Sequence, residues 1–262
     1  FENIVFNIPN PEVIQSFNTT LQFAKEKNAD IVLSSDPDAD RIGVMVHHKN
    51  DWVFLNGQEI ACLLVQYVIQ KKKKDLTQNS VVIKTTVTTN LIKNICEKNG
   101  VKLVGDLLIG FKYIADIMNA LEKDDAINEF LVGCEESHGY IAGNYSRDKD
   151  AVTPAIWLAE LSAELKKEGK TLIDYLDQIY TEYGYFQNYL TEIRLLGASG
   201  QEKINKIQDS LRAKPPKSFG EFAVARVEDC LERKPIVSET DKFAKNVLIF
   251  HFKPTRGAES MK

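Results

Sequence analysis

Three aspartates at alternate positions form the part of the sequence best suited to chemistry. Asp36, Asp38 and Asp40 lie in the run Asp-Pro-Asp-Ala-Asp-Arg, directly after the apolar residues 31–33. Oxygen-only ligands suit a hard cation such as Mg²⁺, and three carboxylates this close would repel one another without one. Arg41, the next residue, could hold a phosphate oxygen while a metal neutralises another, as phosphoryl transfer requires. The loop is therefore a candidate magnesium site beside a candidate phosphate contact.

Two other acidic metal loops do not fit this run. An EF-hand needs Gly at its sixth position and Glu at its twelfth, but Arg41 and His47 occupy those places when the count starts at Asp36. A dehalogenase-type phosphatase has a hydroxyl or apolar residue where this chain has Asp40. Gly105-Asp106 resembles the later acidic motif of such phosphatases, but the second Asp of that motif does not follow at the needed spacing. A capped acidic turn at the surface stays open as the structural alternative.

A second polar loop combines groups that a sugar phosphate needs. Residues 133–140 read Gly-Cys-Glu-Glu-Ser-His-Gly-Tyr after an apolar run, and residues 147–150 read Arg-Asp-Lys-Asp. Glu135 and Ser137 can bind hydroxyl groups, and Lys149 can bind a phosphate. Each piece alone is typical of a solvated turn, but together, in this order after the aspartate loop, they indicate a polyol-phosphate site.

These two loops resemble those of the α-D-phosphohexomutase family, which includes phosphoglucomutases and phosphomannomutases. The Asp-Pro-Asp-Ala-Asp-Arg loop is most similar to the phosphoglucomutase and phosphopentomutase branch. The resemblance runs from residue 8 to residue 185 and more thinly to residue 252. It implies a fold of four domains around a cleft, the first three with a mixed α/β core and the fourth an α+β unit.

The resemblance also implies roles for individual residues of the aspartate loop. Asp36, Asp38 and Asp40 match the family's Mg²⁺ ligands, and Arg41 matches the catalytic arginine that contacts phosphate. A sugar 1,6-bisphosphate is the expected activator and intermediate.

Four further residues match the family's substrate contacts. Glu135 and Ser137 match the pair that binds sugar hydroxyls, and Lys149 matches the basic residue near the substrate phosphate. Gly110 matches the turn whose backbone faces the sugar. The residue before it departs from the family, which has Thr where this chain has Ile109.

The activity that the resemblance implies is the interconversion of glucose 1-phosphate and glucose 6-phosphate through a phosphoserine enzyme and a bisphosphate. A phosphopentomutase, a phosphomannomutase and a non-catalytic sugar-phosphate-binding relative are the alternatives. The family's phosphoserine loop and its Arg-Pro-Ser-Gly-Thr-Glu-Pro phosphate loop do not occur among these residues. We therefore expect an internal piece of a longer protein that is inactive by itself.

Strands that alternate with helices must position both loops, and this alternation predicts βαβ units. We expect an α/β fold of mixed, mostly parallel sheets flanked by helices, with a truncated α+β domain at the C-terminal end. The expected domains are residues 1–56, 57–185 and 186–262. Apolar runs predict strands at residues 31–33, 42–46, 52–55, 81–86, 101–104, 130–133, 222–227 and 247–252. Helical spacing predicts helices at residues 10–28, 58–70, 90–98, 111–121, 153–169 and 201–214.

The composition argues against several classes of partner. The net charge of −4 gives no indication of a large basic surface, so neither nucleic acid nor an anionic membrane is expected as a partner. No apolar run is long enough to cross a bilayer. The four cysteines form no CxxC pair, which suits a reducing compartment, and we expect a cytoplasmic protein.

Overall fold

The computed structural model describes residues 9–232 and 245–253. Residues 1–8 of the first predicted domain, and residues 233–244 and 254–262 of the third, lie outside the described residues. The chain forms two compact units, Phe1–Asn188 and Tyr189–Lys262, which are described separately. Their sheets and helices confirm the predicted mixed α/β class. The sheets are only partly parallel, however, and not mostly parallel as expected, because the strands within residues 31–55 and within the described part of residues 218–252 pair antiparallel. None of the helices in the described ranges is long and apolar enough to span a membrane.

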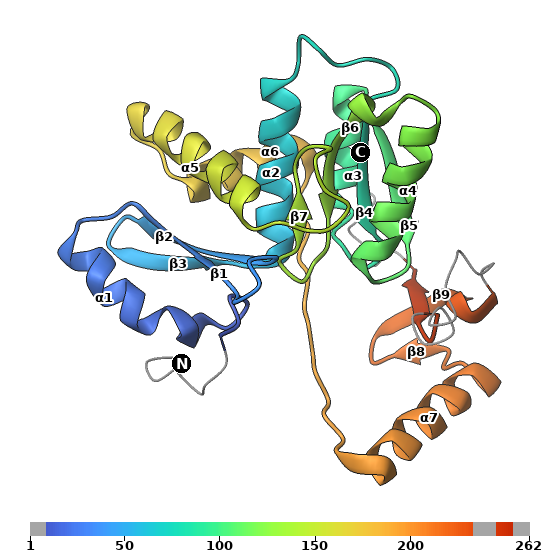
Figure 1. Ribbon diagram of the computed structural model, residues 1–262. Coiled ribbons are helices and arrows are strands. Elements are labelled where there is room, and N and C mark those ends of the chain that lie inside the picture. The colour runs from blue at the N-terminus through green and yellow to red at the C-terminus, as the bar shows by residue number, and fades with distance from the viewer. Residues whose placement is uncertain (1–8, 233–244, 254–262) are drawn as a thin grey trace. The chain divides into compact units, whose positions relative to one another are not determined.

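An antiparallel sheet carries the aspartate loop. Its order is β1-β2-β3, with β1 at Ile31–Ser35, β2 at Ile42–His48 and β3 at Asp51–Leu55 (Figure 1). The loop is the connection from β1 to β2, whose pairing ends with Ser35 opposite Ile42. Both ends of the loop are therefore fixed by the same hydrogen-bonded pair of strands.

The chain enters this sheet through a helix that begins later than predicted. A 3₁₀ helix, η2, covers Ile14–Phe17, and the α-helix α1 covers Asn18–Glu26. The apolar spacing was read correctly, since Phe17 and Ala24 are buried against β1 and β2. The Asn10 side chain accepts from the Glu12 backbone and forms a turn ahead of both helices.

A second sheet carries the other polar loop. Its order is β5-β4-β6-β7, and β4 runs parallel to β5 and β6 while β7 is antiparallel to β6. The bounds are Val81–Thr85 for β4, Lys102–Leu107 for β5, Phe130–Cys134 for β6 and Tyr140–Ile141 for β7. Helices α3 at Leu91–Asn99 and α4 at Phe111–Lys123 connect the parallel strands, and the short 3₁₀ helix η3 is Ile127–Glu129.

Helix α2, Gly57–Lys71, is the centre of the first unit, and all its side chains from Ile60 to Ile69 are buried. It packs against β6 and against α5, Val152–Lys167, and α6, Leu172–Tyr183 (Figure 1). Asn56 caps α2 by accepting from the Gln58 and Glu59 backbone, and the Glu59 carboxylate accepts from the Asn56 backbone. Because this reciprocal cap satisfies exposed amides, it fixes where the helix begins.

The second unit is a small α+β arrangement. Helix α7, Gly197–Ala213, precedes an antiparallel sheet of order β10-β9-β8. The strands are β8 at Ser218–Phe219, β9 at Phe222–Asp229 and β10 at Leu248–Phe252, and the 3₁₀ helix η4 is Cys230–Glu232. Arg212 at the end of α7 pairs with Asp229 at the end of β9 at 2.9 Å, which ties the helix to the sheet.

Candidate active site

The three aspartates of the β1–β2 loop converge as their spacing predicts. Asp36, Asp38 and Asp40 each offer a carboxylate oxygen, and these oxygens lie within 4.8 Å of one another. Oxygens bound to one Mg²⁺ at about 2.1 Å lie at most about 4.2 Å apart, so the donor set is close to that reach. Asp36 is buried and Asp38 is exposed, so the loop has one anchored ligand and one facing solvent. The residues therefore fit a hard divalent cation.

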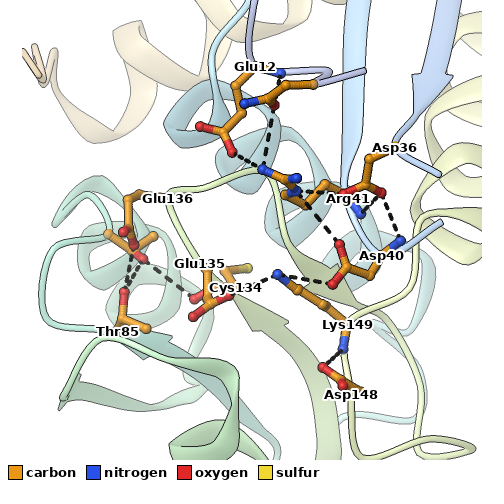
Figure 2. Close-up of polar contacts among 12 residues, drawn as sticks. Glu12, Asp36, Asp40, Arg41, Thr85, Cys134, Glu135, Glu136, Asp148 and Lys149 are labelled. Atoms are coloured by element: carbon orange, nitrogen blue, oxygen red, sulfur yellow. Dashed lines mark hydrogen bonds and ion pairs between the residues drawn. The ribbon is translucent and has the colours of Figure 1, made fainter. Parts of the chain in front are cut away.

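Arg41 is held firmly between two carboxylates. Its Nε atom donates to Asp36 Oδ2 at 2.6 Å, and its Nη1 atom donates to Glu12 Oε1 at 2.8 Å (Figure 2). The Asp36 Oδ1 atom also accepts from the backbone of Asp40 and Arg41 at 3.1 and 3.0 Å. Although burial alone would raise the pKa of Asp36, these bonds from Arg41 lower it below its usual value. The sequence did not predict the role of Glu12, because it lies 29 residues from Arg41 and no local pattern links the two residues.

Lys149 joins the two polar loops. Its Nζ atom lies 3.2 Å from Asp40 Oδ2 and 4.0 Å from Glu135 Oε2 (Figure 2). Burial and the neighbouring Asp36 raise the pKa of Asp40, while Lys149 opposes that rise. The lysine thus bridges a carboxylate of the aspartate loop and a carboxylate of the second polar loop, residues 133–140, hereafter the sugar loop. The two loops are far apart in the sequence.

Glu135 lies at the end of β6 with only 6% of its side chain exposed. Burial raises the pKa of Glu135, while Lys149 and a hydrogen bond from the Gly110 backbone lower it, and the resulting pKa is about 7. The structure therefore brings together Gly110, Glu135 and Lys149, three of the four predicted substrate contacts. The fourth, Ser137, is half-buried two residues further along the loop, and Ile109 before the glycine is 40% exposed.

A buried network behind the sugar loop was not foreseen from the sequence. Thr85 donates to the Glu136 carboxylate at 3.0 Å, and its hydroxyl lies 2.8 Å from that of Thr88. Lys84 donates to the carbonyls of Thr85, Thr88 and Gly105 at 3.2, 2.8 and 3.1 Å. Burial lowers the pKa of Lys84 to about 8, and nearby acidic groups limit the fall. The network fixes the turn after β4 against the loop after β6.

His138 is packed against β2 and β3. Its Nδ1 atom lies 2.9 Å from the carbonyl of Ile42, and its ring stacks on Phe54 at a centroid distance of 5.8 Å. Burial lowers its pKa, which favours the neutral ring. The loop is also tied to α2, because a Cβ on Gly57 would lie 1.9 Å from the Glu136 carbonyl. Only glycine permits that approach.

Comparison with known proteins identifies the family to which these loops belong. The family description "Phosphoglucomutase/phosphomannomutase, alpha/beta/alpha domain III" matches residues 56–183, and domain II of the same family matches residues 2–49. The chain belongs to the phosphoglucomutase/phosphomannomutase family. The resemblance inferred from the two loops is therefore confirmed, and the matched ranges contain both of them.

Curated members of the phosphoglucomutase/phosphomannomutase family match most of this chain. The phosphoglucomutase of Staphylococcus haemolyticus (strain JCSC1435) is 34% identical over 221 residues, which are 84% of this chain and 39% of the relative. The phosphoglucomutase of Staphylococcus aureus (strain MRSA252) is 33% identical over 246 residues, 91% of this chain and 44% of the relative. The chain therefore spans about two fifths of the length of the curated relatives it matches.

Solved structures of the phosphoglucomutase/phosphomannomutase family share the fold. Parafusin, a phosphoglucomutase from Paramecium, matches with a TM-score of 0.56 and 17% identity over 86% of this chain and 36% of that chain. A phosphoglucomutase/phosphomannomutase family protein from Burkholderia thailandensis matches with a TM-score of 0.56 and 16% identity over 84% of this chain and 40% of that chain. At these identities the comparison supports the architecture alone.

Proposed function

We propose that the full-length protein is a phosphoglucomutase-type intramolecular phosphotransferase that interconverts glucose 1-phosphate and glucose 6-phosphate. The observation that carries the proposal is the convergence of the predicted metal and sugar residues through Lys149, which contacts Asp40 and Glu135. The phosphoglucomutase relatives at 34% identity support glucose phosphates over mannose or pentose phosphates.

The metal centre in this proposal is Asp36, Asp38 and Asp40, whose oxygen donors favour Mg²⁺. When bound, Mg²⁺ would stabilise the negative charge that develops on a transferring phosphoryl group. Arg41 would contact the same phosphate from a fixed position, because Asp36 and Glu12 hold its guanidinium.

The sugar side of the proposed site is built from Gly110, Glu135, Ser137 and Lys149. Glu135, with a pKa of about 7, can accept a proton from a sugar hydroxyl and return it near neutral pH. Lys149 would pair with a phosphate oxygen, and Ser137 would bind a second hydroxyl. We further propose residues 1–56, 57–185 and 186–262 as parts of three successive domains of the whole enzyme, with a sugar bisphosphate as its activator.

The proposed location is the cytoplasm. All four cysteines are free and buried, which suits a reducing compartment.

A steady-state assay of the full-length protein tests the proposed activity. Glucose 1-phosphate, mannose 1-phosphate and ribose 1-phosphate are compared by kcat/KM with Mg²⁺ and a trace of sugar bisphosphate. Glucose 1-phosphate should be turned over best, and Asp38→Asn should abolish turnover because a neutral amide is a poorer Mg²⁺ ligand. Asp30→Asn, which changes the same charge in a surface ion pair with Lys166, is the matched control. Preference for another sugar would reassign the substrate, and no turnover of any of the three would favour a binding protein.

A further inference from the structure

Two cations pair with carboxylates of the aspartate loop, and they are held very differently. Arg41 is locked, since its guanidinium pairs with Asp36 at 2.6 Å and with Glu12 at 2.8 Å. Lys149 has one close partner, Asp40, at 3.2 Å, and a longer contact with Glu135 at 4.0 Å. An ammonium on a flexible four-carbon stem moves more easily than a guanidinium fixed at both ends. Lys149 is therefore the cation that can exchange.

A divalent cation at the aspartate loop must disturb the Lys149 contact. Asp40 Oδ2 is the oxygen that Lys149 contacts, and Asp40 Oδ1 lies 3.7 Å from Arg41 Nε. A cation that took Oδ2 would compete with the ammonium directly. A divalent cation bound to Oδ1 would still lie close to the Lys149 ammonium, and the two positive ions would repel each other. Either way, metal binding weakens the contact between Lys149 and Asp40.

The lysine has a second partner when it leaves Asp40. Glu135 Oε2 lies on the sugar loop, so an ammonium released from Asp40 stays beside the residues that would bind the substrate. Its stem passes over Gly139, where an added Cβ would lie 2.6 Å from Lys149 Cδ and 3.2 Å from Glu135 Oε2. Because Gly139 has no side chain, the lysine stem has room to lie between the two loops.

We propose that Lys149 is the counter-ion of the metal-free aspartate loop and that a divalent cation competes with it for Asp40. Metal binding then frees the Lys149 ammonium for the phosphate of an anionic substrate. The inference rests on the proposed function and adds a coupling between the two halves of that site. Because linkage is reciprocal, a bound sugar phosphate that holds Lys149 also tightens the metal.

Titration of the full-length protein with Mn²⁺, followed by the electron paramagnetic resonance signal of the free ion, tests the competition without an activity assay. Lys149→Met should bind Mn²⁺ about tenfold more tightly than the unaltered chain, within the usual range of coupling between sites. Lys149→Arg keeps the charge and should stay close to the unaltered chain. Lys170→Met removes the same charge from a surface pair with Glu168 and is the matched control.

Each outcome assigns a failure to one of the two proposals. Equal or weaker Mn²⁺ binding by Lys149→Met would overturn the competition alone. Absence of saturable Mn²⁺ binding in the unaltered chain would overturn the metal centre and the competition with it. The expected Mn²⁺ pattern, together with no turnover of any sugar phosphate by the full-length protein, would overturn only the proposed activity.

A second variant protects the test against misfolding of Lys149→Met. Gly139→Ala keeps every charge and displaces the lysine stem, because the new methyl group would lie 2.6 Å from Lys149 Cδ. Its glycine lies outside the positive-φ positions, so alanine adds no backbone strain of that kind. Mn²⁺ affinity should rise in this variant as well, and an unchanged affinity would count against the competition.

Discussion

Replacement of Glu135 by glutamine should stabilise the protein at alkaline pH while removing a group of the proposed site. The carboxyl is 6% exposed at the end of β6, and burial raises its pKa from 4.5 to about 7. An ionised carboxylate in this position therefore costs free energy that the neutral, similarly shaped glutamine avoids. Such a cost is expected where a buried group serves function at the expense of stability.

The sign and size of the effect follow from the pKa of Glu135. Below about pH 4.5 the carboxyl is protonated in both the folded and the unfolded chain. As the pH rises from 4.5 to about 7, the unfolded chain loses its proton first, so the free energy of unfolding falls through this window. The interval corresponds to about 3 kcal/mol, all of it lost above pH 8. Glu135→Gln has no such group and should lack this part of the pH dependence.

Urea unfolding in EDTA measures the difference without any contribution from metal. Glu135→Gln should nearly match the unaltered chain at pH 4 and exceed its free energy of unfolding by up to about 3 kcal/mol at pH 8. Glu136→Gln, one residue away, half-buried and bonded to Thr85, is the control for loss of a loop carboxylate. Equal stability differences at pH 4 and pH 8 would refute the reasoning, because the effect would then not come from ionisation of Glu135.

Two other substitutions test the supports of the site. Asn56→Ala removes the reciprocal cap of α2 and should lower stability by about 1 kcal/mol, seen as a fall in Tm of roughly 2–4 °C. Asn90→Ala is its control, because Asn90 makes no side-chain capping bond at α3, and an equal fall would contradict the capping argument. Thr85→Val should raise KM for glucose 1-phosphate in the full-length protein about fivefold, the value of one hydrogen bond of about 1 kcal/mol. Thr181→Val, on the surface of α6, should leave KM unchanged, and a similar rise there would rule out a specific role for Thr85.

Local patterns predicted most elements because their signals lie within the elements themselves. Helix α2 was expected at residues 58–70 and is found at Gly57–Lys71, and β6 was expected at residues 130–133 and is found at Phe130–Cys134. Helix α6 was missed although its signals were present. Thr171 and Asp174 form a capping box, and the buried residues at helical spacing are Leu172, Tyr175, Leu176, Ile179 and Tyr183.

Short strands could not be predicted in the same way. Strand β7 has two residues, Tyr140–Ile141, and exists because Cys134 and Gly133 of β6 pair with them. Strand β8, Ser218–Phe219, pairs in the same way with β9. Such strands are defined by a partner elsewhere in the chain, so no periodicity within them can reveal them.

The residues of the candidate site show the same contrast between local patterns and contacts with distant partners. The convergence of Asp36, Asp38 and Asp40 follows from alternate spacing in one loop, so the sequence alone predicts it. The contact from Lys149 to Asp40 joins residues more than a hundred positions apart, and only the packing of the two sheets in one unit produces it. Sequence resemblance could assign Lys149 to the substrate phosphate, but not to an aspartate of the metal loop.

The charges of this region explain why the two loops need to be coupled. Two cations, Arg41 and Lys149, face five acidic side chains, namely Glu12, Asp36, Asp38, Asp40 and Glu135. When all are ionised, the excess of negative charge opposes the entry of a phosphate. A divalent cation removes two of these charges, and a proton on Glu135, whose pKa is about 7, removes the third. An anionic sugar phosphate should therefore bind well only after the metal has bound. The release of Lys149 by that metal would also leave its ammonium free to pair with the phosphate.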